Sequence, residues 1–157
     1  MIFATVGTQL PFPRLIDALE DIAKRRDLRI LAQTCDAGRQ SDVLTLRSKM
    51  PPDEFADAFQ SAPFIIAHAG IGTVLSARRY RKPLIILARR ADLGEHRNDH
   101  QLATAAQMRE RPGIYVAGNG DSLEDLIVNS GSLKPPSAEG SASKRLLVDC
   151  IRTFITQ

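Results

Sequence analysis

The sequence predicts a single α/β domain built on a doubly wound, Rossmann-like parallel sheet. Short runs rich in β-forming residues alternate with longer segments whose apolar residues recur at helical spacing. Pro63–Ala67 and Leu84–Leu87 are almost unbroken apolar runs, as expected of strands buried on both faces of a sheet. The length of 157 residues fits one such domain and is too short for two.

In the first half of the chain we expect four strands and two helices. Pro11 and Pro13 suit a helix start, and the apolar residues from Phe12 to Ile22 recur on one helical face. Pro51-Pro52-Asp53 begins the second helix, which carries Phe55 and Phe59 on one side. The expected strands are Ile2–Val6, Arg29–Thr34, Val43–Leu46 and Pro63–Ala67.

In the second half the expected strands are Leu84–Leu87 and Ile114–Ala117. Helices are expected up to about Tyr80, from about Asp99 to Arg109, and over Asp121–Val128, with an ordered polar loop at 88–99. Residues 1–129 form the predicted domain. Residues 130–143, rich in Ser, Gly and Pro, predict a flexible linker, and 144–157 predict a helix that docks on its own domain or on a partner.

Composition narrows the class of protein. Apolar residues make up 43% and charged residues 25%, which is typical of a soluble globular protein. No apolar run reaches the roughly 18 residues of a membrane-spanning helix, and no signal-peptide pattern opens the chain, so a cytoplasmic location is expected. Cys35 and Cys150 have no metal or redox spacing and are expected to be unlinked thiols.

The net charge of +3 is mild, but basic residues cluster at 78–82 and again at Arg89, Arg90 and Arg97. Such clusters attract nucleic acid, anionic lipid or a phosphorylated substrate, or they form a solvated helix face. With two tyrosines and no tryptophan, the chain lacks the aromatic residues of a single-stranded nucleic-acid platform. No nucleic-acid partner is therefore expected.

Two glycine-bearing turns follow expected strands, at the sheet edge where doubly wound folds bind ligands. Gly7-Thr8 either lets a ligand approach the backbone or makes a tight turn. His68–Thr73 begins a helix, so its backbone N–H groups either suit a diphosphate or belong to a structural turn. Neither a dinucleotide fingerprint nor a Walker A loop is present.

The polar segment Leu93–Gln101 separates a strand from a helix. Asp99, His100 and Gln101 fall at the expected helix start, where side chains can bond sugar hydroxyls. Alternatively, the segment is a solvated charged loop. His96 and His100 are four residues apart, but no third ligand stands nearby, which disfavours zinc.

The segments VGTQLPFPRLIDAL, HAGIGTVLSARRYRKPLIIL and LGEHRNDHQLA together resemble the carboxyl-terminal, donor-binding domain of GT-B glycosyltransferases of the family 28 type. The resemblance covers the chain to about residue 128. It extends to single-domain relatives, which are the catalytic subunit of the dolichol-linked N-acetylglucosamine transferase and bacterial exopolysaccharide subunits. It implies inverting transfer from a UDP-sugar to a lipid-diphosphate-linked acceptor, with no cofactor and no metal. The sugar would be glucuronic acid, glucose or N-acetylglucosamine, and LGEHRNDHQ favours the first two.

The resemblance also implies roles for single residues. His68 is a candidate catalytic base, or else a hydrogen-bonding or packing residue. Ser76 stands where many relatives carry an acid that grips the ribose, and a hydroxyl cannot replace a two-oxygen acceptor. The residues implied for donor binding are Gly7 and Thr8 (phosphates and sugar), His68, Gly70, Gly72 and Thr73 (diphosphate), Ser76 (ribose), and Asp99, His100 and Gln101 (hexose hydroxyls).

In the two-domain relatives, the acceptor and usually the base come from an amino-terminal domain for which this chain has no room. We therefore expect a membrane-associated partner subunit, which binds the lipid-linked acceptor and holds the chain peripherally at the inner face of the membrane. Two other classes stay open. One is a non-catalytic module that binds UDP-sugars, and the other is an interaction protein of flavodoxin-like architecture that binds no sugar.

Overall fold

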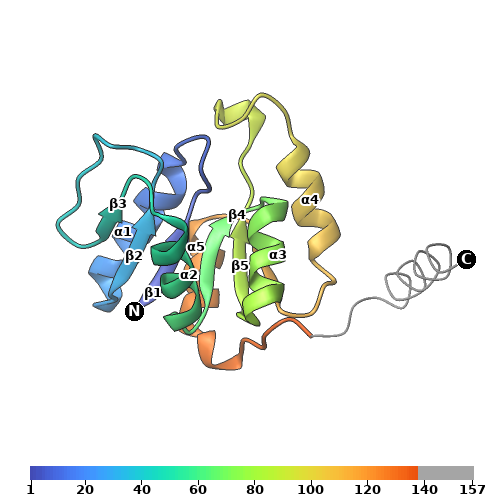
Figure 1. Ribbon diagram of the computed structural model, residues 1–157. Helices are drawn as coiled ribbons and strands as arrows, with labels where there is room; N and C mark the ends of the chain where they lie inside the picture. The colour runs from blue at the N-terminus through green and yellow to red at the C-terminus, as the bar shows by residue number, and fades with distance from the viewer. Residues whose placement is uncertain (138–157) are drawn as a thin grey trace, which may run out of the picture.

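The computed structural model describes residues 1–137, which form a six-stranded parallel sheet with helices on both faces (Figure 1). The strand order is β3-β2-β1-β4-β5-β6, and all neighbouring strands run parallel. The predicted doubly wound sheet is confirmed. The strands are β1 (Ile2–Thr5), β2 (Ile30–Gln33), β3 (Thr45–Arg47), β4 (Ile65–His68), β5 (Leu84–Leu87) and β6 (Ile114–Ala117).

Helices α1 and α5 cover one face of the sheet, and α2, α3 and α4 cover the other (Figure 1). None of the helices in the described part is long and apolar enough to cross a membrane. Helix α3 begins at Ile71, so that Gly72 and Thr73 lie in its first turn. The helices are α1 (Pro13–Arg26), α2 (Pro52–Ser61), α3 (Ile71–Tyr80), α4 (His100–Met108) and α5 (Gly120–Val128), with short 3-10 turns η1 (Ala91–Leu93) and η2 (Ser130–Ser132).

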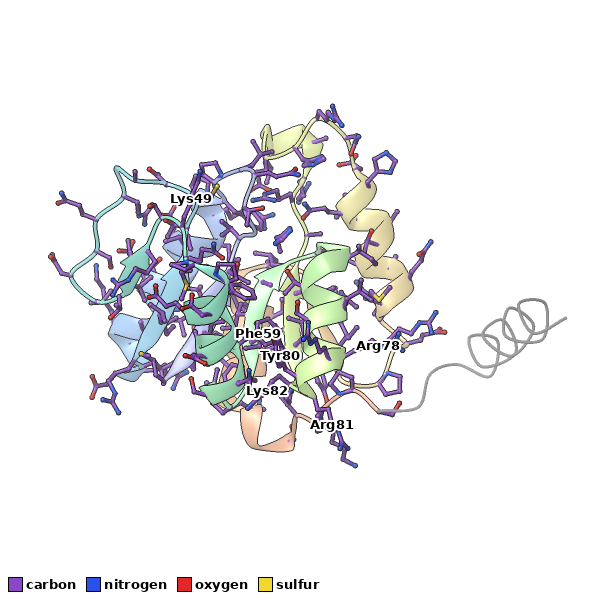
Figure 2. All side chains as sticks on the ribbon, in the orientation of Figure 1. Lys49, Phe59, Arg78, Tyr80, Arg81 and Lys82 are labelled. Carbon is purple, nitrogen blue, oxygen red and sulfur yellow. The ribbon has the colours of Figure 1, made fainter. Side chains whose placement is uncertain are left out.

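The sheet separates two apolar clusters, because successive residues of a strand point to opposite faces. On one face, α1 buries the apolar stripe that its sequence predicts. On the other face, Phe59 packs its ring on Phe3 and on Tyr80, with centroids 6.1 and 5.4 Å apart. Figure 2 shows Phe59 and Tyr80 together between α2 and α3. Their contact fixes the two helices to each other and to β1.

The basic cluster at 78–82 lies at the carboxyl-terminal end of α3, as Figure 2 shows for Arg78, Arg81 and Lys82. The Lys82 ammonium donates to the carbonyl of Ala62 at 2.8 Å, while Arg78 and Arg79 are exposed. A ten-residue helix is about 15 Å long, so this cluster is far from the carboxyl ends of the strands. These positions favour a solvated helix face over a phosphate-binding role.

The sequence predicts a flexible linker over 130–143, but its described part, 130–137, is packed against the domain. The amide of Lys134 donates to the hydroxyl of Tyr115 at 2.8 Å, and Pro136 is buried. A Cβ on Gly113 would lie 2.2 Å from the Pro136 nitrogen, so the backbone at 135–136 can pass here only because residue 113 has no side chain. Proline here stiffens an extended, packed segment. The predicted helix at 144–157 lies outside the described residues.

Candidate functional site

The strand order reverses between β1 and β4, and doubly wound sheets bind ligands at such a point, beyond the carboxyl ends of the strands. The two predicted glycine turns follow these two strands and meet around a cavity of about 480 Å³. The predicted donor-binding residues that line the cavity are Gly7, Thr8, His68, Gly70, Gly72, Thr73, Ser76 and Gln101.

The start of α3 presents unused backbone donors to this cavity. Gly70 is the N-cap residue, no side chain caps the helix, and the Gly70 amide itself donates to the His68 carbonyl at 2.8 Å. The amides of Ile71, Gly72 and Thr73 have no acceptor among the described residues. Three open N–H groups at the positive end of a helix form a ready site for an anion.

The His68 ring is seated against both glycine turns. A Cβ on Gly7 would lie 2.8 Å from His68 Cε1, and a Cβ on Gly70 would lie 2.2 Å from Nε2. Gly7 also has φ +83°, which residues with side chains rarely adopt. The sequence suggests that Gly7 leaves space for a ligand, but the imidazole fills the space beside its α-carbon. The two glycines therefore hold the ring where the two loops meet.

Gly72 has a different reason to be small. Nothing lies within 4 Å of the position that its Cβ would take, and it lines the cavity. One turn further along α3, the Ser76 hydroxyl donates to the Gly72 carbonyl at 3.1 Å. This bond uses the only hydroxyl hydrogen of Ser76, so that the hydroxyl oxygen can act toward the cavity only as an acceptor.

His68 is uncharged at neutral pH. Burial and the nearby Arg89 guanidinium lower the pKa of His68 from its usual 6.5 to about 4. A general base works best with a pKa near the operating pH, so this value disfavours the base role. The hydrogen-bonding and packing alternative fits both the pKa and the seat between the glycines.

Arg89 lines the cavity but is absent from the predicted donor-binding residues, because the sequence shows it only as part of a basic cluster that either attracts an anionic partner or is solvated. Its side chain is only 3% exposed and lines the cavity. Nη2 donates to the carbonyls of Val6, Leu10 and Pro11 at 3.1, 2.5 and 3.3 Å, and the guanidinium lies 5.0 Å from the centroid of the Phe12 ring. Its position two residues after an all-apolar strand was the available signal, since that is the edge of the sheet where ligands bind.

Thr5 and Gln33 form a buried polar floor that was also missed. The Thr5 hydroxyl donates to Gln33 Oε1 at 2.8 Å and accepts from the Gly7 amide at 3.1 Å. Both residues close a strand and line the cavity. As single polar residues at strand ends, they are indistinguishable in sequence from ordinary strand boundaries.

Of the three residues implied to read the hexose, only Gln101 lines the cavity. Gln101 Oε1 accepts from the Arg89 amide at 3.2 Å. Asp99 instead accepts from the Ala91 amide at 2.9 Å and closes the loop around η1, while His100 is exposed. This differs from the prediction for Asp99 and His100, because successive helical positions are about 100° apart and α4 turns only one of the three inward.

His96 also lines the cavity, and its Nδ1 lies 3.1 Å from Asn98 Oδ1. Within residues 1–137, no group of three or more His, Cys, Asp or Glu side chains is placed to hold a metal ion. The His96–His100 pair thus has no further ligand in the part of the chain that the structure describes.

A second groove of about 640 Å³ adjoins the cavity through Leu10 and His96. Although it is larger, three of its charged residues, Arg14, Asp17 and Glu95, are already in ion pairs. The Arg14 guanidinium donates to both oxygens of Glu95, at 2.6 and 2.8 Å. Among residues 1–137, no buried side-chain atom without a hydrogen-bond partner belongs to the lining of this groove.

The first cavity is different in this respect. Among the described residues, the buried side-chain atoms that lack a hydrogen-bond partner are His68 Nδ1 and Arg89 Nε, and both residues line it. Each such group costs roughly 1–3 kcal/mol. Unsatisfied polar groups of this kind are typical of functional sites.

Comparison with known proteins finds one similar sequence and several structures of the same fold. No family model matches the chain. The UDP-N-acetylglucosamine transferase subunit ALG13 of Yarrowia lipolytica is 24% identical over 136 residues, covering 78% of this chain and 67% of the relative. The solution structure of an ALG13 matches with TM-score 0.62 and 18% identity, covering 94% of both chains.

Two larger enzymes share the fold. The glycotransferase of kitacinnamycin matches with TM-score 0.60 and 16% identity, over 83% of this chain and 34% of that enzyme. The UDP-GlcNAc 2-epimerase of Methanocaldococcus jannaschii, in complex with UDP-GlcNAc and UDP, matches with TM-score 0.61 and 13% identity, over 96% of this chain and 45% of that enzyme. The chain thus spans less than half of either one.

The predicted resemblance is confirmed by both the sequence match and the fold. The chain is a homologue of the ALG13 subunit and has the α/β fold of GT-B glycosyltransferase domains.

Proposed function

We propose that this chain is the donor-binding, catalytic subunit of a two-component, inverting glycosyltransferase. It takes a sugar from a UDP-sugar and delivers it to a lipid-diphosphate-linked acceptor in polysaccharide synthesis. A membrane-associated subunit binds the acceptor and holds the chain peripherally at the membrane. The donor sugar is glucuronic acid, glucose or N-acetylglucosamine.

One observation carries this proposal: the residues that hold the unused polar groups described above all line one cavity at the switch point of the sheet. These groups are the three open amides at the start of α3 and the buried atoms of His68 and Arg89. The volume of about 480 Å³ lies within the range of roughly 300–1,000 Å³ that small-molecule sites occupy. Open amides and a cation suit a diphosphate better than an uncharged ligand.

The reaction is a direct displacement at the anomeric carbon. The acceptor oxygen forms the new glycosidic bond as the bond to the diphosphate breaks, and UDP departs with the electron pair. Ile71, Gly72 and Thr73 donate to the diphosphate as its charge grows, which stabilises the transition state more than the ground state. The base that removes the acceptor proton is assigned to the partner, because the pKa of His68, about 4, is too low.

A Gly72→Val variant tests the site. The valine side chain would project into space that is open in the structure, so it should obstruct the diphosphate and leave the fold intact. We expect UDP binding, measured by calorimetry, to fall at least about tenfold, as for the loss of one charged hydrogen bond. Gly131→Val is the matched control, because Gly131 also has nothing within 4 Å of its Cβ position but does not line the cavity. Wild-type UDP affinity in Gly72→Val would refute the assignment.

Sugar transfer itself distinguishes the enzyme from a non-catalytic UDP-sugar-binding module. Radiolabelled UDP-sugars are incubated with membranes that contain the lipid-linked acceptor, with and without the candidate partner, a membrane-anchored protein with a second α/β domain. Transfer that requires both subunits supports the proposal. Donor binding without transfer under any pairing supports the sensor, and UDP binding weaker than millimolar supports an interaction protein.

A further inference from the structure

We propose that Arg89 is a second anion-binding element of the cavity and binds an anionic oxygen of the donor. This inference rests on the proposed function, because it takes the ligand to be a nucleoside-diphosphate sugar. Within that function it assigns a role to a residue outside the three family-like segments that hold the donor.

The charge of Arg89 is buried without a counter-ion among the described residues. None of the ion pairs among residues 1–137 includes Arg89. The acid that influences it most is Glu95, whose two oxygens are taken by Arg14, and the amide of Arg90 also donates to Glu95, at 2.8 Å. A buried, unpaired guanidinium costs several kcal/mol, and an anionic ligand offsets that cost.

The described residues use only part of the Arg89 guanidinium. All three hydrogen bonds from its side chain leave Nη2 and end on uncharged carbonyls of the loop after β1. Nη1 donates to no described residue and keeps accessible surface, while Nε is buried and has no partner in the described part of the chain. Because a guanidinium carries five N–H donors in a rigid fork, donors remain for a ligand after Nη2 is satisfied.

The Arg89 side chain is held in place before any ligand binds. Nη2 is held by Val6, Leu10 and Pro11, and the guanidinium packs on the ring of Phe12. The side chain therefore loses little conformational entropy when it binds a ligand. Arg89 also lies close enough to lower the pKa of His68, whose ring touches the Gly70 turn at the start of α3. The cation and the open amides thus line one cavity around the same histidine.

The anionic oxygen has two possible sources, the diphosphate of any UDP-sugar and the carboxylate of a uronic sugar. Calorimetry with UDP, UDP-glucose and UDP-glucuronate separates them. We expect Arg89→Gln to weaken binding about tenfold or more, as for a lost charged hydrogen bond. An equal loss for all three ligands identifies the diphosphate, and a loss confined to UDP-glucuronate identifies the carboxylate.

The matched control is Arg90→Gln, which removes the same charge one residue away. Arg90 is exposed, pairs with Asp92 and does not line the cavity, so all three affinities should stay at the wild-type value. Wild-type affinity of Arg89→Gln for all three ligands would overturn the proposal. So would an equal loss in Arg90→Gln, which would reflect general electrostatics.

Because Arg89→Gln also removes the clamp on the loop after β1, a second measurement uses the unmodified protein. The side-chain Nε–H resonance of Arg89 is followed by nitrogen-15 NMR as UDP or UDP-glucuronate is added. The proposal expects this resonance to shift with saturation. If the amides of Ile71 to Thr73 shift while Arg89 does not, this inference fails and the proposed function stands. If neither shifts, both fail.

Discussion

Burial of the His68 ring between Gly7 and Gly70 makes the stability of the domain depend on pH. The ring is largely buried beside Arg89, and the pKa of His68 falls from 6.5 to about 4, first through burial and then through the charge of Arg89. In the unfolded chain both causes vanish and the ordinary value returns. Replacement by glutamine removes the titrating group and keeps a polar side chain of similar length.

The sign follows from the lowered pKa. Below pH 6.5 the unfolded chain takes up a proton at His68, whereas the folded protein does so only near pH 4. The contribution of neutral His68 to the free energy of unfolding is therefore fully present above pH 6.5 and is lost as the pH falls toward 4. Between pH 7 and pH 5 this single group should lower the free energy of unfolding by about 2 kcal/mol.

Urea denaturation of the wild type and of His68→Gln at pH 7 and pH 5 measures this contribution. The difference between the two proteins cancels the contributions of all other titrating groups. We expect the wild type to lose about 2 kcal/mol more than the variant over this interval. Equal losses in both proteins would show that His68 titrates normally in the fold, and the buried seat between the glycines would then be wrong.

Other substitutions test the remaining contacts. Gly70→Ala should destabilise the domain by about 1–3 kcal/mol, because the added methyl group collides with the His68 ring. In thermal unfolding, adding His68→Ala to this variant should recover much of the lost stability, and purely additive losses would contradict the contact. Gln101→Ala should reduce discrimination between UDP-sugars more than affinity for UDP, and equal losses in calorimetry would exclude a hexose contact. Asp99→Ala should lower the free energy of unfolding by about 0.5–1.5 kcal/mol, because the Ala91 amide loses its acceptor. The affinity for UDP-sugars should stay unchanged, and a loss of affinity would show that Asp99 contacts the donor.

Much of the fold could be predicted because its signals are local. The strands β5 and β6 match their predicted bounds, since unbroken apolar runs in a parallel sheet are hard to confuse with surface elements. Strand β3 is shifted by one to two residues from Val43–Leu46, since it has three residues, of which only Leu46 is apolar, and no apolar run marks its bounds. Both glycine turns were placed correctly at strand ends.

What the sequence could not supply is the pairing of β1 with β4, which depends on contacts distant in the chain. That pairing brings the Gly7 and Gly70 turns onto one histidine and explains both glycines by packing. The role of Arg89 could not be predicted for a similar reason, because the carbonyls that it bonds lie about 80 positions earlier in the chain. In the sequence it is only one member of a basic cluster. Which of Asp99, His100 and Gln101 lines the cavity depends on how α4 is rotated about its axis, and this rotation buries Gln101 alone of the three.

The central claim is that the open amides at the start of α3 bind the diphosphate of the donor. Titration of the nitrogen-15-labelled chain with UDP tests it most directly, with uridine as the control that lacks phosphates. The claim predicts that the backbone amides of Ile71, Gly72 and Thr73 shift most with UDP and little with uridine. It is contradicted if saturating UDP leaves those three amides unchanged and instead moves the residues of the Arg14–Glu95 groove.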